Sequence, residues 1–286
     1  MRISVLIFMV IFYGCSATKS NTSLVKPLKR VALVIGNRDY KVLKSLKNPI
    51  NDAVSIKGVL EDLNFNVTLV ENLHYRNFEK VLKNFKSKID NNTIVFFYFA
   101  GHANTLQRNS SEEYLSMIEE NNKLNLVSLY RLYAMLIEAN ARYNIVAIDA
   151  CRNYQEDESS MELERTRGAD WREVLFDNGS VLKPNVELDN NYSSSFPPST
   201  LISYATMHNQ KAYDASSSDP RHSPYSKALI NHLDDEEVPI EVVFKRVRSE
   251  LIREMNGKQI NLEESSLEKN VWLQPKRGKV SLSTAF

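Results

Sequence analysis

Cysteine, glycine and charge of one sign are all scarce in this sequence of 286 residues. It has two cysteines, eight glycines and nine prolines, which does not suggest a fibrous or disordered chain. The formal net charge of +1 gives no reason to expect a nucleic acid or an acidic membrane surface as partner. No stretch reaches the roughly 20 apolar residues that a membrane span needs. What is present is 43% hydrophobic and 25% charged residues, typical of a globular protein with one large domain or two small ones.

The N-terminus differs from the rest of the chain. Residues 1–14 begin with a positive charge and continue as an almost unbroken apolar run, and Cys15 and a polar stretch follow at once. This order predicts a secretory signal over 1–14 and a polar tether over 15–29. A small residue directly before the cysteine resembles the lipobox of bacterial lipoproteins, in which the cysteine is lipidated, although Phe12 and Tyr13 depart from that pattern. An ordinary cleaved signal is the alternative.

Lipid on Cys15 would make this an exported protein of the bacterial cell envelope that faces the periplasm, with the lipid anchor as its only contact with a membrane. Cys151 would then be the single thiol of the folded domain, predicted over residues 30–286. A lone thiol in an exported protein is open to oxidation. Cys151 is therefore either buried and inert or retained because its reactivity is used.

From Arg30 onward, short apolar runs alternate with segments whose apolar residues recur at helical spacing. Strands are predicted at residues 31–36, 66–71, 93–102, 143–151, 199–206 and 271–275. Helices are predicted at residues 51–63, 78–89, 126–140, 224–233 and 240–255. This alternation predicts an α/β fold, a parallel sheet with helices on both faces.

Two of the predicted strands run into residues that can do chemistry. VFFYFA leads into Gly101–His102, and NIVAID leads into Ala150–Cys151. Sites in parallel sheets form at the carboxyl ends of strands, so neighbouring strands would bring the imidazole of His102 beside the thiol of Cys151. Such a pair can make and use a thiolate nucleophile. Taken singly, a buried cysteine is usually a small hydrophobe and a lone histidine usually structural, so the spacing alone is a moderate signal.

The motifs around both residues resemble those of a known enzyme family. FYFAGH and IDACRN resemble the two catalytic motifs of the caspase-like cysteine peptidases, particularly the bacterial members of the metacaspase and caspase superfamily. RVALVIGNRDYKVLKSLKNPINDA resembles the family's opening strand and first loop, and TLISYAT, SPYSKALINHL, VFKRVRSEL and GKQINLEESSL follow the order of its C-terminal part. The resemblance covers Arg30 to Leu273. It implies a three-layer α/β/α sandwich around a mostly parallel sheet of about six strands.

The resemblance also implies a catalytic mechanism. Cys151 attacks the scissile carbonyl, and His102, as general base and acid, handles the proton that goes to the leaving amine. The oxyanion hole uses the backbone N–H of Cys151 and that of the residue after the histidine, here Ala103 where the family usually has glycine. Alanine keeps this N–H unless the backbone there needs a positive φ. No third triad residue and no cofactor are implied; calcium activates some relatives, but no acidic cluster matches a site.

For specificity, the resemblance points to basic residues. Members that cut after Arg or Lys line the primary pocket with carboxylates, because a buried cation needs a paired charge. Asp149, two residues before Cys151, matches one such position, Asp52 matches the other, and Asp214 is a weaker third candidate. Capping of a helix N-terminus is the alternative for Asp52. Cleavage after Asp would need arginines that have no match here.

Residues 152–198 form a long, charged connection where relatives separate their large and small portions. Arg165 and Arg167 are candidate self-cleavage sites, with a solvated loop as the alternative. The sequence thus predicts an endopeptidase that acts on a peptide or protein substrate. The alternative is a catalytically weak or inactive caspase-fold interaction protein of the envelope, which Ala103 favours and the retention of both His102 and Cys151 opposes. No oligomeric state follows from the sequence.

Overall fold

A computed structural model describes residues 27–105, 113–120, 123–152, 196–208, 210–216 and 218–274. Within these residues the strands are β1 (Lys29–Gly36), β2 (Asn66–Glu71), β3 (Thr93–Ala100), β4 (Ala103–Thr105), β5 (Glu113–Glu120), β6 (Lys123–Ser128), β7 (Tyr143–Asp149), β8 (Thr200–Tyr204) and β9 (Leu262–Ser265). The helices are α1 (Pro49–Asp62), α2 (Tyr75–Lys86), α3 (Leu129–Ala139), α4 (Pro224–His232) and α5 (Ile240–Glu254). The predicted signal, Cys15, Arg165 and Arg167 lie outside the described residues, so export, lipidation and self-cleavage stay predictions.

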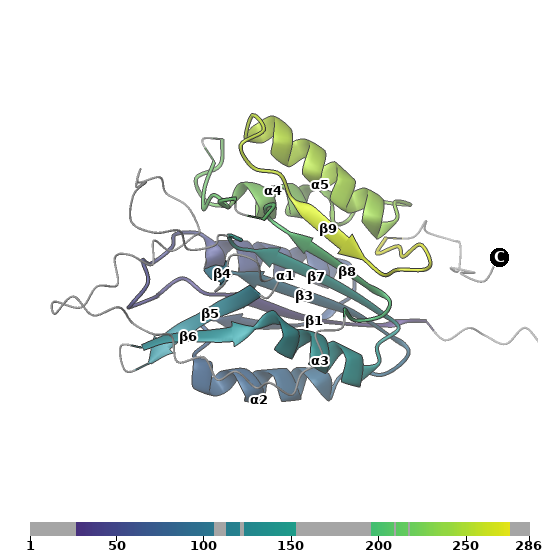
Figure 1. Ribbon diagram of the computed structural model, residues 1–286. Coiled ribbons are helices and arrows are strands. Elements are labelled where there is room, and N and C mark those ends of the chain that lie inside the picture. Colours follow the sequence, from purple (N-terminus) through teal and green to yellow (C-terminus); the bar gives the residue numbers. More distant parts are fainter. Residues whose placement is uncertain are drawn as a thin grey trace, which may run out of the picture.

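The main sheet has six strands in the order β2-β1-β3-β7-β8-β9 (Figure 1). Neighbouring strands run parallel except at β9, which is antiparallel to β8. Every residue of β3 and β7 is buried. Central strands that are covered on both faces need such continuous apolar runs, which is why they stood out in the sequence. The predicted α/β fold with a mostly parallel sheet is confirmed.

Alternate residues of the central strands point into two separate cores. On β3, Phe96 and Tyr98 face the core that α1, α4 and α5 cover, here called the α1 face. Phe97 and Phe99 face the core that α2 and α3 cover, here called the α2 face. Figure 1 shows α2 and α3 on one side of the sheet and α4 and α5 on the other. The period of two along each strand therefore decides which side chains share a face.

A second, antiparallel sheet of order β4-β5-β6 lies beside the main one. Leu115 and Met117 of β5 point into the α2-face core, while Tyr114 and Ile118 pack against the loop of residues 40–46. The sequence prediction did not include this small sheet. It placed a helix start at residue 126, but residues 126–128 complete β6 and α3 begins after them.

The predicted last strand at 271–275 is wrong. Trp272 forms only an isolated bridge with Pro239. Among the described residues the last strand is β9, which pairs antiparallel with Leu201–Tyr204 of β8. After α5 the chain turns at Gly257, whose φ of 77° suits glycine, and so it enters the sheet edge in the opposite direction.

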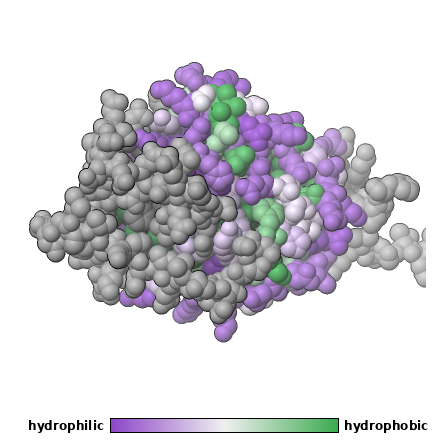
Figure 2. Space-filling view, viewed as in Figure 1, coloured by the Kyte–Doolittle hydropathy of each residue, from purple (hydrophilic) through white to green (hydrophobic). Residues whose placement is uncertain are grey.

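The described surface is largely polar. On the face shown in Figure 2, hydrophilic side chains cover most of the described surface, and hydrophobic ones lie in small separate groups. The large exposed hydrophobic residues are spread over α1, α3, α5 and the loop after β8: Val54, Ile137, Met207, Val242 and Ile252. Within the described residues, no helix combines the length and apolarity that crossing a membrane requires.

Candidate active site

The pairing of β3 with β7 places His102 and Cys151 at the same edge of the sheet. Ala100 is in register with Asp149, and the N–H of Gly101 donates to the Asp149 carbonyl at 3.2 Å. His102 and Cys151 therefore each lie two residues beyond a paired position on adjacent strands, which run about 4.8 Å apart. The structure thus places both residues just beyond the ends of adjacent strands, and their catalytic roles stay a prediction. Both are 1% exposed.

The imidazole of His102 is oriented by a main-chain carbonyl. Its Nε2 lies 2.8 Å from the carbonyl oxygen of Lys44. Since a carbonyl can only accept, Nε2–H is the donor, and Nδ1 becomes the basic nitrogen of the neutral ring. Sequence reasoning missed Lys44, because any residue supplies a carbonyl and no side chain signals its use.

Tyr40 holds the backbone of His102. Its hydroxyl accepts the His102 N–H at 3.1 Å and donates to the Ser116 carbonyl at 3.0 Å. Its ring lies 4.6 Å from the imidazole, centroid to centroid. A Cβ at Gly101 would lie 2.5 Å from the tyrosine oxygen, so this close approach requires glycine. Tyr40 is therefore a positioning residue that the sequence did not reveal.

The loop of residues 40–46, which carries the Lys44 carbonyl, is tied to the small sheet. The carboxylate of Glu119 on β5 accepts the N–H of Lys41 at 2.8 Å and that of Leu43 at 2.9 Å. Glu119 is 2% exposed, so these charge-assisted bonds are shielded from water. The small sheet therefore fixes the carbonyl that orients His102.

The thiol of Cys151 points into the α1 face and is covered by a short stretch of main chain. The N–H of Ala212 donates to Sγ at 3.0 Å, and the thiol donates to the Ala212 carbonyl at 3.6 Å. The N–H of Arg152 donates to the Gln210 carbonyl at 3.4 Å. Residues 210–213, here called the covering segment, thus lie directly on the nucleophile candidate.

One buried amide fixes the covering segment. Gln259 Oε1 accepts the N–H of Tyr213 at 3.1 Å, and Gln259 Nε2 donates to the Ala205 carbonyl at 2.9 Å. Gln259 is fully buried, so both bonds form away from water. Its side chain joins the covering segment to the end of β8, and displacing the segment requires breaking at least the bond to Tyr213.

Ala103 opens β4, where it is in register with Leu115, and its side chain packs in the α2-face core. Its φ is not among the positive values of the chain, so alanine brings no left-handed strain at this position. The sequence predicts that Ala103 serves in the oxyanion hole unless the backbone there needs a positive φ, and it has none. The use of the Ala103 and Cys151 N–H groups for an oxyanion stays a prediction.

Asp149 and Cys151, two residues apart, share the α1 face, as the period of two requires. Asp149 is fully buried at the end of β7. Its Oδ2 accepts hydrogen bonds from the hydroxyls of Ser223 at 2.5 Å, of Tyr98 at 3.4 Å and of Ser226. Hydroxyl groups thus donate hydrogen bonds to this carboxylate, which lies on the same face of the sheet as Cys151.

Asp52 lies in the first turn of α1 and is also fully buried. Its Oδ1 accepts from the N–H of Ser223 at 3.2 Å and lies 3.0 Å from Nδ1 of His222. Asp52 therefore contacts the loop before α4, the same loop that contacts Asp149. The structure brings the two carboxylates together at Ser223; we call them the Asp52–Asp149 pair. Their role in binding substrate stays a prediction.

Asp214 has a different setting. Its carboxylate accepts from the N–H groups of Lys47 at 2.6 Å and Asn48 at 3.3 Å. The Asn48 side chain donates in return to the Asp214 carbonyl at 2.5 Å. These bonds tie the loop before α4 to the start of α1. Asp214 thus supports the neighbourhood of Asp52, and direct contact with substrate stays a prediction.

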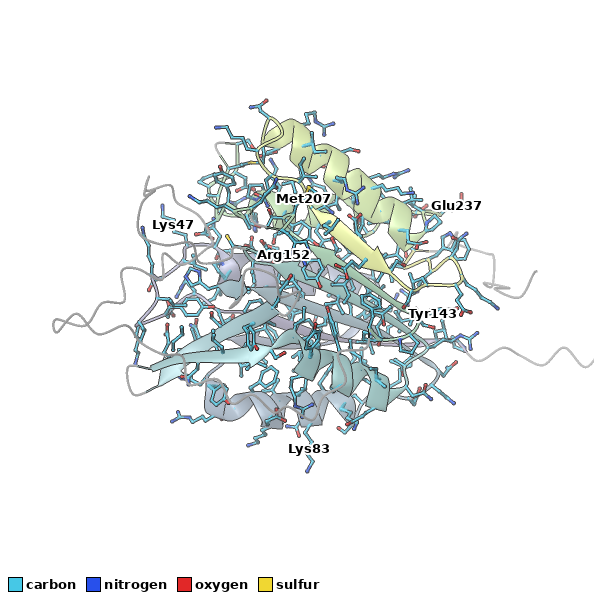
Figure 3. The ribbon with its side chains drawn as sticks, viewed as in Figure 1. Lys47, Lys83, Tyr143, Arg152, Met207 and Glu237 are labelled. Atoms are coloured by element: carbon cyan, nitrogen blue, oxygen red, sulfur yellow. The ribbon has the colours of Figure 1, made fainter. Side chains whose placement is uncertain are left out.

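A buried ion pair lies beside the nucleophile candidate. Arg152 pairs with Glu113 at the start of β5, and its guanidinium lies 3.7 Å from the ring centroid of Tyr204. Burial raises the pKa of Glu113 to about 7, with Arg152 acting in the opposite direction. In Figure 3, Tyr143 and Arg152 mark the two ends of β7, and Lys47 lies on the Arg152 side.

No group of three or more His, Cys, Asp and Glu side chains that could hold a metal ion occurs within the described ranges. Calcium dependence therefore stays a question for assay.

Comparison with known proteins bears on the family and the fold. The family model of the caspase domain matches residues 29–272. The chain is similar to human mucosa-associated lymphoid tissue lymphoma translocation protein 1, with 24% identity over 126 residues, 43% of this chain and 15% of that protein. It therefore spans about 15% of the length of that curated relative. The crystal structure of caspase-1 from Spodoptera frugiperda superposes with a TM-score of 0.55 at 16% identity, covering 89% of this chain and 94% of that one. At this identity the likeness concerns the fold.

Proposed function

Since this chain belongs to the caspase-domain family, we propose that it is a cysteine endopeptidase that cleaves peptide bonds after Arg or Lys. Cys151 is the nucleophile, and His102 is the general base and acid. The observation that carries this proposal is the geometry of the two strand ends. The register of β3 with β7 brings both residues to one edge, and the Lys44 carbonyl leaves Nδ1 of His102 as the basic nitrogen.

The chemistry follows from these groups. His102 Nδ1 takes the thiol proton of Cys151, and the thiolate sulfur attacks the scissile carbonyl carbon to form a tetrahedral oxyanion. The N–H groups of Ala103 and Cys151 donate to that oxyanion, where charge develops only in the transition state. His102 then returns the proton to the leaving amine, the C–N bond breaks, and a water molecule hydrolyses the acyl-enzyme.

Cleavage after a basic residue is supported by the Asp52–Asp149 pair. Both carboxylates are fully buried and meet at Ser223, and Asp149 lies two residues from Cys151 on the same face. A buried pair of carboxylates stabilises a guanidinium or ammonium group and repels an acidic side chain. Substrate preference for Arg or Lys is therefore expected, and cleavage after Asp is not.

Substrate must first displace the covering segment. Cys151 is 1% exposed, and the Ala212 main chain contacts its sulfur. Opening exposes the thiol together with the N–H and carbonyl groups of residues 210–213, which can then pair with an extended peptide. The proposal therefore includes a closed resting state and an open, substrate-bound state.

The test uses the mature chain and fluorogenic peptides that end in Arg, Lys or Asp, with Cys151→Ala as the matched control. We expect release of the fluorophore after Arg and Lys only, and none from the control. The assay is run across pH and with and without added calcium. If no peptide is cut faster by the wild type than by the control, the peptidase proposal fails and an interaction protein with a caspase fold is the better account.

A further inference from the structure

We propose that His222 is a specificity-determining residue of this site, whose imidazole holds the Asp52 carboxylate in the resting enzyme and yields it to the cationic side chain of the substrate. The inference rests on the proposed function, because it assumes that the Asp52–Asp149 pair receives a basic residue. It adds the group that competes with substrate for one of the two carboxylates.

The geometry places His222 between Asp52 and the surface. Nδ1 of His222 lies 3.0 Å from Oδ1 of Asp52. The Asp52 side chain has no exposed area, whereas 16% of the His222 side chain is exposed. A ligand that approaches Asp52 from the side of His222 therefore meets the imidazole first. Asp52 cannot bind a second cation at Oδ1 without a shift of this ring.

The two carboxylates differ in the kind of donor that holds them. The donors to Asp149 include the hydroxyls of Tyr98, Ser223 and Ser226, which stay neutral at any pH of interest. His222, which faces Asp52, is ionisable. When His222 is protonated it neutralises one of the two negative charges, and when it is neutral both charges remain for the substrate. Histidine is the side chain that makes this change near neutral pH.

Other charged groups lie on the loop that carries His222 and on the helices that follow it. Asp219 and Arg221 come from the same loop as His222 and act on it in opposite directions. From α4, the ammonium of Lys227 pairs with Glu254 of α5. From α1, Asp52 faces His222 directly. The hydrogen bond that His222 donates to Asp52 is the largest influence, and it raises the pKa of His222 above its ordinary value of 6.5.

Linkage gives the direction of the effect. Binding of an Arg or Lys side chain at Asp52 displaces protonated His222 and favours release of its proton. The same coupling means that protonation of His222 weakens substrate binding. KM for basic peptides should therefore rise as pH falls through the pKa of His222. The effect belongs in KM rather than kcat, because His222 acts on the carboxylate that binds the substrate side chain.

The variant His222→Asn keeps a donor near the position of Nδ1 and removes the titration. The matched control is His232→Asn at the end of α4, where the histidine pairs with Asp235 and Glu250. We expect wild type and control to show a KM for Arg peptides that changes about fivefold or more between acidic and mildly alkaline pH, the low end of typical coupling. His222→Asn should show a nearly constant KM, with kcat following the same pH profile in all three proteins.

A second measurement does not depend on turnover. In the Cys151→Ala chain, an NMR titration follows the imidazole signals, and the His222→Asn spectrum identifies the one that belongs to His222. Adding acetyl-arginine amide should lower the pKa of His222. An unshifted His222 pKa in the presence of bound probe overturns the inference.

The two proposals fail in different ways. If Arg peptides are cut and their KM has the same pH dependence with and without His222, the inference is wrong and the peptidase proposal stands. If no peptide is cut by any variant, the peptidase proposal fails, and a His222 signal that does not respond to the arginine probe then removes the inference as well. If His222→Asn does not fold, the titration of His222 in the Cys151→Ala chain, assigned from its contact with Asp52, decides.

Discussion

At the scale of single residues, two uncharged groups orient His102. The Lys44 carbonyl accepts a hydrogen bond from Nε2–H, and the Tyr40 hydroxyl accepts one from the backbone N–H. A neutral acceptor orients the ring without the extra stabilisation that a carboxylate gives to a protonated imidazole. A histidine held in this way can return its proton to a leaving amine more readily than one held by an acid.

Tyr40→Phe tests this arrangement. The change removes the hydroxyl and leaves the His102 N–H and the Ser116 carbonyl without that partner in a buried place, at a cost of about 1–3 kcal/mol in the free energy of unfolding. We expect kcat for Arg peptides to fall by about tenfold to a hundredfold, because small displacements of a catalytic group are costly. Thermal unfolding and kcat are measured on the same preparation.

Tyr133→Phe is the control, since Tyr133 also has a buried hydroxyl, which pairs with that of Tyr204. It should lose stability while its kcat stays close to that of the wild type. Equal losses of kcat in the two variants would mean that Tyr40 supports the fold and does not position His102.

How far the sequence predicted the site follows from the kind of group involved. The sequence could reveal side chains that end or follow buried apolar strands, because reactive or charged groups are unusual there. These are His102, Asp149 and Cys151. Lys44 and Ala212 act through their main chains, so no residue type marks them. Ser223 joins Asp52 to Asp149 across more than 70 residues of sequence, and only the folded chain shows that contact.

At the scale of elements, the covering segment is the part that has to move. Its main chain contacts the thiol, and the side chain of Gln259 holds it against the end of β8. The segment is not part of β7 or β8, which full ladders of hydrogen bonds hold. Local opening therefore costs less free energy than any disruption of the sheet.

Gln259→Leu should favour the open state. The change removes the acceptor of the Tyr213 N–H, a bond worth about 1 kcal/mol, so the open population and the rate of alkylation of Cys151 by iodoacetamide should rise about fivefold. The measurement uses a Cys15→Ser background so that Cys151 is the only thiol. Asn144→Leu is the matched control, because this buried amide donates to the Pro198 carbonyl at the opposite end of β7. An equal increase in both variants would show general loosening instead of segment opening.

The elements that the sequence missed have a common cause. β4 and β6 are short and pair only within the small sheet, and β6 runs directly into α3, so its apolar residues looked like the first turn of that helix. β9 has the sequence LEES, with half of its residues exposed, so it lacks the apolar run of a central strand. An edge strand is defined by its partner, here β8, more than by its own composition.

At the scale of the whole molecule, the Arg152–Glu113 pair links the main sheet to the small sheet. The raised pKa of Glu113, about 7 against an ordinary 4.5, means that the folded chain binds more protons than the unfolded chain between these values. The free energy of unfolding should therefore fall as pH rises through this range. The raised pKa of His222 acts in the same direction at the upper end of the range.

Glu113→Gln should reduce the loss of stability between pH 4.5 and 7. The measurement is the midpoint of thermal unfolding at each pH. It should also lower stability at pH 8, because Arg152 loses the carboxylate that balances its buried charge. Glu79→Gln, which removes an exposed partner of Arg131, should leave the pH profile unchanged. If the unfolding midpoint of Glu113→Gln changes with pH as steeply as that of the wild type, other groups cause the pH dependence.

The α1 face and the small sheet with its loop pack as separate clusters, and this separation has an evolutionary consequence. The carboxylates of the proposed substrate pocket, Asp52 and Asp149, belong to the α1 face. Tyr40, Lys44 and Glu119, which hold His102 and its loop, belong to the small sheet and that loop. Substitutions in one group need not disturb the packing of the other, and effects of distant sites usually add. A lineage built on this scaffold can therefore change the proposed substrate pocket while keeping the hydrogen bonds that orient His102.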